Sequence, residues 1–338
     1  MDAVRRLWLS LTTFVTSQAA KTATLNSAPR LQEGHADCTV SQNDLPSRED
    51  MDLCRETTAF SSTVSLPPPH EVRKKAEEDG IDISNTFRPD PVYFPESGIV
   101  VKWGSDVTVA EGQCLWFLRK HLNDQVPVPQ IYGWTRDGDQ TFLYMELVSG
   151  DRLSDRWEHS PLREKIQLCA QLRDMIAAWR CIKKDDGSKE LSQIGGQALR
   201  DIIFSDGGFY PAGPFLTVRD FHCCFAKLTS RCASGSNDPR KTTVELQGLS
   251  DDVPTVFTHG DLDQSNILIS RPDDGPLRIV AIIDWHQAGW YPEHWEWLKA
   301  QSVAVSGSDW VTEYLPKILE PAPYEYFYAW EYVRMATI

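Results

Sequence analysis

Apolar and polar residues alternate in two different ways along this chain. Residues 98–103 ("GIVVKW") and 141–147 form short apolar runs that predict strands, and residues 108–122 carry apolar side chains at helical spacing. Helical spacing then dominates residues 162–183 and 217–230, on either side of a stretch rich in glycine and proline. A small sheet followed by helices predicts an α+β fold with two lobes.

Changes in periodicity and a run of prolines suggest where these lobes begin and end. Residues 1–65 show little periodicity and are predicted to be a variable tail or targeting segment. Three prolines at 67–69 then precede a charged helix predicted at residues 70–79. We place the N-terminal lobe at residues 66–147 and the C-terminal lobe at residues 148–338.

The charge balance and the cysteines limit which partners and which compartment we expect. The chain has 34 basic and 48 acidic residues, a formal charge of −14, which disfavours nucleic acid and anionic membranes as partners. No apolar run is long enough to cross a membrane, so we expect no stable membrane insertion. Eight cysteines without a CxxC pair indicate a reducing, cytoplasmic setting. Residues 3–32 lack acidic side chains, which leaves open a mitochondrial presequence, a weak secretory signal or a loose tail.

The most informative stretch lies late in the chain. Apolar runs at residues 266–269 and 279–284 are separated by "RPDDGP", a turn sequence that predicts an antiparallel hairpin. Asn266 opens the first strand and Asp284 closes the second, so both side chains are expected at the open end of the hairpin, beside Asp261. Two carboxylates and an amide oxygen suit Mg²⁺ carrying phosphate oxygens better than they suit zinc.

The spacing His-x-Asp-x-x-x-x-Asn, followed by a lone Asp after a hairpin, is typical of a kinase catalytic loop. The segments "THGDLDQSNILI" and "IIDWHQAGWYPEHWEW" resemble the aminoglycoside phosphotransferase family of kinase-like enzymes, particularly its fungal members. This resemblance extends from about Leu66 to the C-terminus and includes "VPVPQIYGW" and "MELVSG".

The resemblance implies a protein-kinase-like fold, an activity and a set of site residues. A small sheet lobe with one helix would bind ATP, and a larger, mainly helical lobe would carry catalysis and the acceptor. Asp261 would be the catalytic base, and His259 would order the catalytic loop. Asn266 and Asp284 would bind Mg²⁺. The implied reaction is the transfer of the γ-phosphate of ATP to a hydroxyl group.

A kinase also needs a group that pairs with the nucleotide phosphates. Lys102 ends the strand "IVVK", and Glu111 shares a helix face with apolar residues, where an unpaired carboxylate would be costly. We therefore predict that these two residues form an ion pair. By resemblance alone, backbone groups near Glu146 and Leu147 would contact adenine.

Two features separate this chain from protein kinases. Residues 85–99, "NTFRPDPVYFPESGI", contain three prolines and one glycine, so no GxGxxG loop precedes Lys102. The chain also reaches Pro292 soon after Asp284, which leaves no room for the long segment that holds a peptide substrate. We therefore expect a small-molecule acceptor carrying a hydroxyl. The missing loop motivates an alternative, a catalytically weakened kinase-fold protein that acts as a binding or scaffold protein.

Further alternatives remain open at this point. His259, Asp261 and Asp263 form an H-x-D-x-D pattern that also occurs in metallohydrolases. The aromatic residues of the C-terminal half, among them Trp285 and Trp310, suit either a box for a cationic amine or core packing. The sequence does not decide the identity of the acceptor or the oligomeric state.

Overall fold

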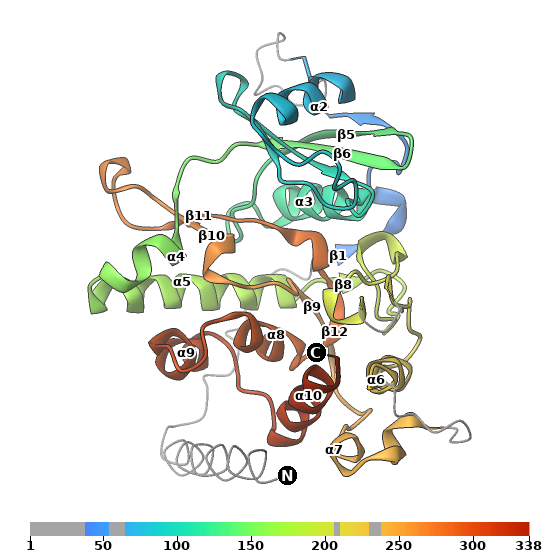
Figure 1. The fold of residues 1–338 in the computed structure, drawn as a ribbon. Helices are drawn as coiled ribbons and strands as arrows, with labels where there is room; N and C mark the ends of the chain where they lie inside the picture. The colour runs from blue at the N-terminus through green and yellow to red at the C-terminus, as the bar shows by residue number, and fades with distance from the viewer. Residues whose placement is uncertain (1–37, 54–64, 206–209, 230–237, 338) are drawn as a thin grey trace. The chain divides into compact units, whose positions relative to one another are not determined.

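The computed structural model describes residues 38–53, 65–205, 210–229 and 238–337 (Figure 1). The N-terminal part contains a five-stranded antiparallel sheet in the order β2-β5-β6-β4-β3. Both predicted helices flank this sheet, where the resemblance implied one. The elements are β2 (Met51–Asp52), α2 (Pro69–Glu78), β3 (Val92–Phe94), β4 (Ile99–Gly104), α3 (Val109–Leu122), β5 (Ile131–Asp137) and β6 (Gln140–Glu146).

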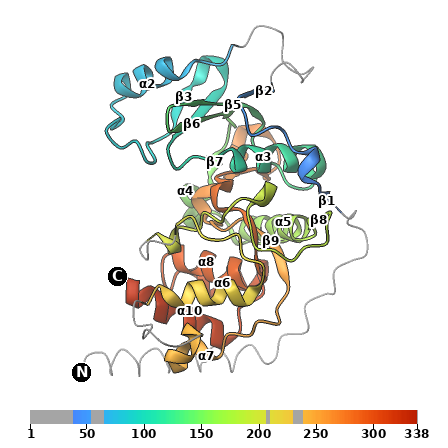
Figure 2. The ribbon, with the colours of Figure 1, turned by 90° about the vertical axis from the view of Figure 1, so that its right-hand side faces the viewer.

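The two faces of the sheet pack against different helices, as the positions of α2 and α3 in Figures 1 and 2 show. Ile99, Val101 and Trp103 of β4 lie in an apolar cluster with residues of α2. Leu143 of β6 belongs to the other cluster, which contains the buried residues of α3. Because successive side chains of a strand point to opposite faces, Lys102 lies on the α3 side of β4.

The prediction that residues 1–65 form a tail is wrong for residues 38–53. β2 extends the sheet beside β5, and β1 (Thr39–Val40) pairs in parallel with β8 (Lys183–Lys184). Val40 and Leu53 are buried, and Gln113 of α3 donates to the carbonyl oxygen of Pro46. Short strands that add to the edge of a sheet leave little periodicity in the sequence, which is why the pattern missed them. The targeting segment considered at residues 3–32 lies outside the described residues.

The C-terminal part is mainly helical, so the predicted α+β class with two lobes is confirmed. No helix in the described ranges is long and apolar enough to cross a membrane. The helices are α4 (Leu153–Arg156), α5 (Leu162–Arg180), α6 (Val218–Lys227), α7 (Val244–Gln247), α8 (Trp295–Val303), α9 (Leu315–Ile318) and α10 (Tyr324–Thr337). Short strands pair between them: β7 (Asp151–Arg152), β9 (Thr255–Thr258), β10 (Ile267–Ile269), β11 (Ile279–Ile282) and β12 (Gly289–Pro292).

The predicted hairpin is confirmed, with a small correction at its open end. β10 and β11 are antiparallel, and Ile267 lies opposite Ile282. Asn266 ends a short 3-10 helix (Gln264–Asn266) before β10, and Asp284 follows β11 in a left-handed conformation with φ 63°. Both side chains therefore flank the strands instead of belonging to them. β5 was not predicted, since its glycine and its polar final residues interrupt the apolar run.

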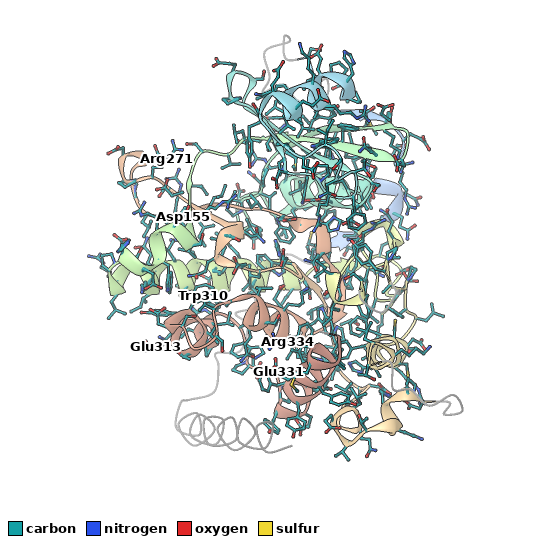
Figure 3. The ribbon with its side chains drawn as sticks, viewed as in Figure 1. Asp155, Arg271, Trp310, Glu313, Glu331 and Arg334 are labelled. Atoms are coloured by element: carbon teal, nitrogen blue, oxygen red, sulfur yellow. The ribbon has the colours of Figure 1, made fainter. Side chains whose placement is uncertain are left out.

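The aromatic residues of the C-terminal half are packed into the core. Trp295 meets the rings of Phe221 and Phe225, with centroids 4.7 and 5.4 Å away. Trp310, labelled in Figure 3, lies edge-on to Trp157 at 4.9 Å. Every candidate for an aromatic box is at most 7% exposed: Trp285, Trp290, Tyr291, Trp295, Trp297 and Trp310. Core packing, the second of the two interpretations, is therefore confirmed.

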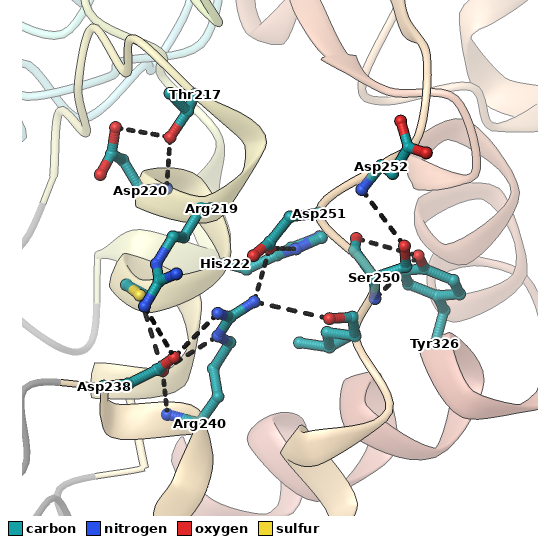
Figure 4. Close-up of polar contacts among 12 residues, drawn as sticks. Thr217, Arg219, Asp220, His222, Asp238, Arg240, Ser250, Asp251, Asp252 and Tyr326 are labelled. Carbon is teal, nitrogen blue, oxygen red and sulfur yellow. Dashed lines mark hydrogen bonds and ion pairs between the residues drawn. The ribbon is translucent and has the colours of Figure 1, made fainter.

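A polar network joins α6 to the segment before β9 (Figure 4). Arg240 donates to Asp238 and to Asp251, and Asp251 also faces the Nδ1 atom of His222 at 3.3 Å. Burial lowers the pKa of His222 to about 4, although Asp251 opposes the shift. Burial and the neighbouring His222 lower the pKa of His294 to about 3. Both imidazoles are therefore neutral in the folded protein.

These histidines predict a loss of stability in acid. The unfolded chain protonates histidine near pH 6.5, whereas the folded protein does so only near pH 4 or below, so stability falls as the pH drops below 6.5. Each group contributes about 1.4 kcal/mol per pH unit in that window. In urea unfolding, His294→Gln is expected to reduce the loss between pH 6.5 and 5 by about 2 kcal/mol. The same change at His159, which is exposed, is the control and should leave the loss unchanged.

Candidate active site

Lys102 lies between two carboxylates that come from different lobes. Its Nζ donates to Oε1 of Glu111 on α3 at 2.8 Å and to Oδ1 of Asp284 at 2.6 Å. The ion pair predicted between Lys102 and Glu111 is therefore present. Burial lowers the pKa of Lys102, but the carboxylates of Asp284 and Glu111 outweigh it and leave this pKa above the ordinary value. The lysine is thus held as a cation at the junction of the two lobes.

Asp261 and Asn266 meet in the loop before β10. Nδ2 of Asn266 donates to the backbone oxygen of Asp261 at 2.9 Å and to its Oδ2 at 3.3 Å. Nδ1 of His259 accepts the N–H of Asp261 at 3.1 Å, and Nε2 faces the oxygen of Ile283 at 3.0 Å. These contacts require a neutral imidazole protonated on Nε2. His259 thereby ties this loop to the end of β11, beside Asp284.

The two aspartates of the site have opposite pKa shifts. Burial raises the pKa of Asp261, Lys299 partly offsets this, and the nearby charge of Asp284 raises it further. For Asp284 burial acts in the same direction, but Lys102, with smaller contributions from Arg88 and His286, lowers its pKa below the ordinary value. Asp261 is thus the better proton acceptor, and Asp284 remains an anion suited to a cation.

Glu296 is a residue of the site that the sequence did not reveal. Its Oε2 accepts the N–H of His259 at 2.7 Å, and its Oε1 accepts the N–H of Gly260 at 3.0 Å. The side chain is fully buried on α8. A glutamate inside the aromatic run "HWEWLKA" was the available signal, since a carboxylate among apolar residues needs partners.

Two other polar groups beside the site also went unpredicted. Asp201 accepts from Nζ of Lys299 at 2.8 Å and from Nε1 of Trp295 at 2.7 Å, and all three residues are buried. Asp106, which follows β4, accepts from Arg200 and from the hydroxyl of Tyr210 through Oδ1, each at 2.6 Å. Its Oδ2 lies 3.3 Å from Nε2 of His286, two residues beyond Asp284.

Contacts made by Asp263 and His259 disfavour the metallohydrolase interpretation. Oδ1 of Asp263 caps the short helix before β10, accepting from the N–H of Ser265 at 2.9 Å and from its hydroxyl at 2.6 Å. Both ring nitrogens of His259 already have partners within the protein. The described residues contain no group of three or more His, Cys, Asp or Glu side chains placed to hold a metal ion.

The predicted adenine contacts are restricted by the backbone. The N–H of Glu146 donates to the oxygen of Gln130, and the N–H of Leu147 donates to the oxygen of Gly98, both at 2.8 Å. The Glu146 side chain in turn accepts the N–H of Gln130 at 3.0 Å. A contact between adenine and these two residues has to use their carbonyl oxygens, and it stays a prediction.

The donor set at the open end of the hairpin fits Mg²⁺. Asp284 supplies a carboxylate that stays ionised, and Asn266 uses its amide nitrogen within the loop, which leaves its Oδ1 for a ligand. Magnesium prefers a few such oxygens, together with water and phosphate oxygens.

Comparisons with known proteins point to one family. A family model described as the phosphotransferase enzyme family matches residues 108–336. The crystal structure of aminoglycoside-3'-phosphotransferase of type VIII is 16% identical, with a TM-score of 0.47, over 80% of this chain and 100% of that chain. APH(3'')-Id from Streptomyces rimosus is 13% identical, with a TM-score of 0.45, over 80% of this chain and 99% of that chain. The streptomycin-ATP-APH(2")-IIa ternary complex is 14% identical, with a TM-score of 0.47, over 81% of this chain and 87% of that chain.

No curated protein matches the sequence. The structural similarities are too low to carry an argument about substrate, so the assignment depends on the family model, which spans more than half of the chain.

Proposed function

Because the chain belongs to the phosphotransferase enzyme family, we propose that it is an ATP- and Mg²⁺-dependent kinase acting on a hydroxyl group of a small molecule. The observation that carries this proposal is the meeting of Lys102 and Asp284, at 2.6 Å, beside the loop that holds Asp261 and Asn266. Phosphoryl transfer depends mainly on positioning and charge neutralisation, and these residues supply both.

Each residue has a distinct part in the proposed reaction. Lys102, oriented by Glu111, pairs with phosphate oxygens of ATP. Asp261 accepts the proton of the acceptor hydroxyl as the hydroxyl oxygen attacks the γ-phosphorus, and the bond from this phosphorus to the bridging oxygen breaks so that ADP leaves. Asp284 and Asn266 would hold Mg²⁺, which when bound neutralises phosphate charge. His259 and Glu296 keep the loop in place through its backbone.

The short connection after Asp284 supports a small acceptor. Only a single-turn 3-10 helix (Trp285–Gln287) and Ala288 separate Asp284 from β12. Protein kinases use a long segment at this point to hold a peptide. We therefore place the specificity of this enzyme among small molecules.

Nucleotide binding is the first test of this proposal. ATP with Mg²⁺ is expected to raise the melting temperature of the protein, because ligand at about 100 times Kd stabilises the folded state by about 2.7 kcal/mol. Asp284→Ala should remove most of this stabilisation. Differential scanning fluorimetry with and without Mg²⁺ measures both effects.

A matched control lies at the other end of the same hairpin. Asp273→Ala removes an exposed carboxylate from the turn and should keep the full response to ATP. A wild-type protein that shows no stabilisation at millimolar ATP and Mg²⁺ would contradict the kinase proposal and favour the scaffold alternative.

We also propose that this protein works in the cytoplasm. The described cysteines are free, and burial raises the pKa of several of their thiols, Cys114 and Cys169 among them, which suits a reducing cytoplasm. A mitochondrial destination remains the alternative, and it requires that deletion of residues 1–30 abolish import.

A further inference from the structure

The segment before β3 takes the place of a glycine-rich loop and is tied closely to the end of β4. The N–H groups of Ser105 and Asp106 donate to the carbonyl oxygens of Thr86 and Phe87, both at 2.9 Å. Gly104 permits this approach, since with φ 131° its added Cβ would lie 2.5 Å from the oxygen of Phe87. The segment is therefore a fixed part of the site.

Its backbone is poorly suited to holding phosphates. Glycine-rich loops bind phosphate oxygens with backbone N–H groups. Here Pro89 and Pro91 have no N–H, that of Thr86 donates to the oxygen of Ser84 at 3.0 Å, and that of Arg88 donates to Oδ1 of Asn85 at 3.4 Å. Thr86, Arg88, Pro89 and Pro91 therefore offer no free backbone N–H to a phosphate, which favours a side-chain donor.

The side chain of Arg88 supplies such a donor. Its Nε lies 3.6 Å from Oδ2 of Asp106, but it makes no hydrogen bond there. Asp106 already accepts from Arg200 and Tyr210, and His286 faces its Oδ2. Nε and Nη2 of Arg88 are consequently buried without a hydrogen-bond partner. The charge of Arg88 is paired with Asp106 and its side chain is 32% exposed, but the two N–H groups without hydrogen bonds are costly unless a ligand satisfies them.

The position of the guanidinium matches where phosphates would lie. Oδ2 of Asp106 lies 3.6 Å from Nε of Arg88 and 3.3 Å from Nε2 of His286, which follows Asp284 by two residues. Phe87, the preceding residue, faces the ring of Tyr210 across the two lobes at 6.5 Å. Arg88 thus lies at the lobe junction, beside Asp106 and near the residues that follow Asp284.

We infer that Arg88 binds the phosphate chain of the nucleotide, replacing with one guanidinium the backbone donors of a glycine-rich loop. This inference rests on the proposed kinase function and adds a residue that selects triphosphate over nucleoside. A guanidinium offers two parallel donors to phosphate oxygens, which a single lysine does not.

Binding measurements on the full chain test this inference. Arg88→Gln is expected to raise the Kd of ATP with Mg²⁺ by about 10- to 100-fold and to leave the Kd of adenosine unchanged. Arg88→Lys keeps the charge but loses the two parallel N–H donors of the guanidinium, so it should raise the Kd of ATP by a smaller factor. Isothermal titration calorimetry with ATP, AMP and adenosine provides these constants.

A second measurement separates phosphate binding from a structural role. Because Arg88 makes only a long ion pair with Asp106, and Asp106 keeps its hydrogen bonds from Arg200 and Tyr210, Arg88→Gln should change the melting temperature of the ligand-free protein little. Arg73→Gln is the control, since this arginine lies on α2 and binds Gln140 and Asp137. It should leave the ratio of the ATP and adenosine constants as in the wild type.

The outcomes distinguish this inference from the function on which it rests. A folded wild-type protein that binds no ATP overturns the proposed function. A wild-type protein that binds ATP, with Arg88 variants that keep the wild-type ratio of ATP to adenosine constants, overturns the Arg88 assignment alone. A lower ligand-free melting temperature with that ratio kept would make Arg88 a structural residue.

Discussion

Replacing Asp261 by asparagine is expected to lower the rate of phosphoryl transfer by about 10²- to 10⁴-fold, the usual contribution of a general base. Asparagine has the same shape but accepts no proton from the acceptor hydroxyl. The raised pKa of Asp261 makes the wild-type carboxylate a better acceptor than an ordinary aspartate. ATP binding should stay nearly unchanged, because Lys102 and Asp284 are intact.

The measurement compares the two proteins on a metabolite extract. Each is incubated with ATP and Mg²⁺, and the rate at which a new phosphorylated mass appears is followed by mass spectrometry. Asp263→Asn is the matched control in the same loop, since asparagine also caps a helix and the Asp263 side chain accepts from the N–H and hydroxyl of Ser265. Equal rates for wild type and Asp261→Asn would rule out the base assignment. An equal loss of rate in Asp261→Asn and Asp263→Asn would show that the loss reflects disturbance of the loop and not removal of a base.

Replacing Asp201 by alanine is expected to lower the free energy of unfolding by about 3 to 5 kcal/mol, because it leaves the charge of Lys299 buried and unpaired. The side chains of Asp201 and Lys299 are 0% and 3% exposed. Asp201 also accepts from Trp295 and from the N–H of Ile203, so its carboxylate accepts from three groups, Lys299 included. Urea unfolding at neutral pH measures the loss.

Two further variants define what this loss means. Adding Lys299→Met to Asp201→Ala should recover part of the stability, since it removes the unpaired charge. Asp137→Ala breaks the pair with Arg73, whose side chains are 49% and 31% exposed, and should change stability by less than about 1 kcal/mol. A loss at Asp201 no larger than that at Asp137 would show that the buried pair has no special weight.

Features close together along the chain were predictable. The hairpin and its turn lie within a short segment, and strand geometry alone brings Asn266 and Asp284 to one end. Lys102 and Glu111 are nine residues apart, and the strand and helix periods place them on facing surfaces. The family resemblance depends on the same local motifs. These motifs identified the phosphotransferase family, which the family model then confirmed.

The tertiary structure decided which distant residues complete the site. Glu296 reaches the backbone of His259 across 37 positions, and Asp201 reaches Lys299 across 98. Arg88 is distinguished by two N–H donors without hydrogen-bond partners, and this depends on how Asp106 is shared with Arg200. Residues 38–53 joined the fold through pairing with β5 and β8, without a periodic pattern of their own.

The sequence by itself determined the α+β class, the phosphotransferase family, the hairpin and the lysine–glutamate pair, because each follows from local periodicity or from a short motif. Only the tertiary structure decided the packing of the tryptophans, the support of the loop that holds Asp261, and the N–H groups of Arg88 that lack hydrogen-bond partners. A buried polar group is recognised by the partners that packing brings to it or withholds from it, and those partners come from elements far apart in the chain.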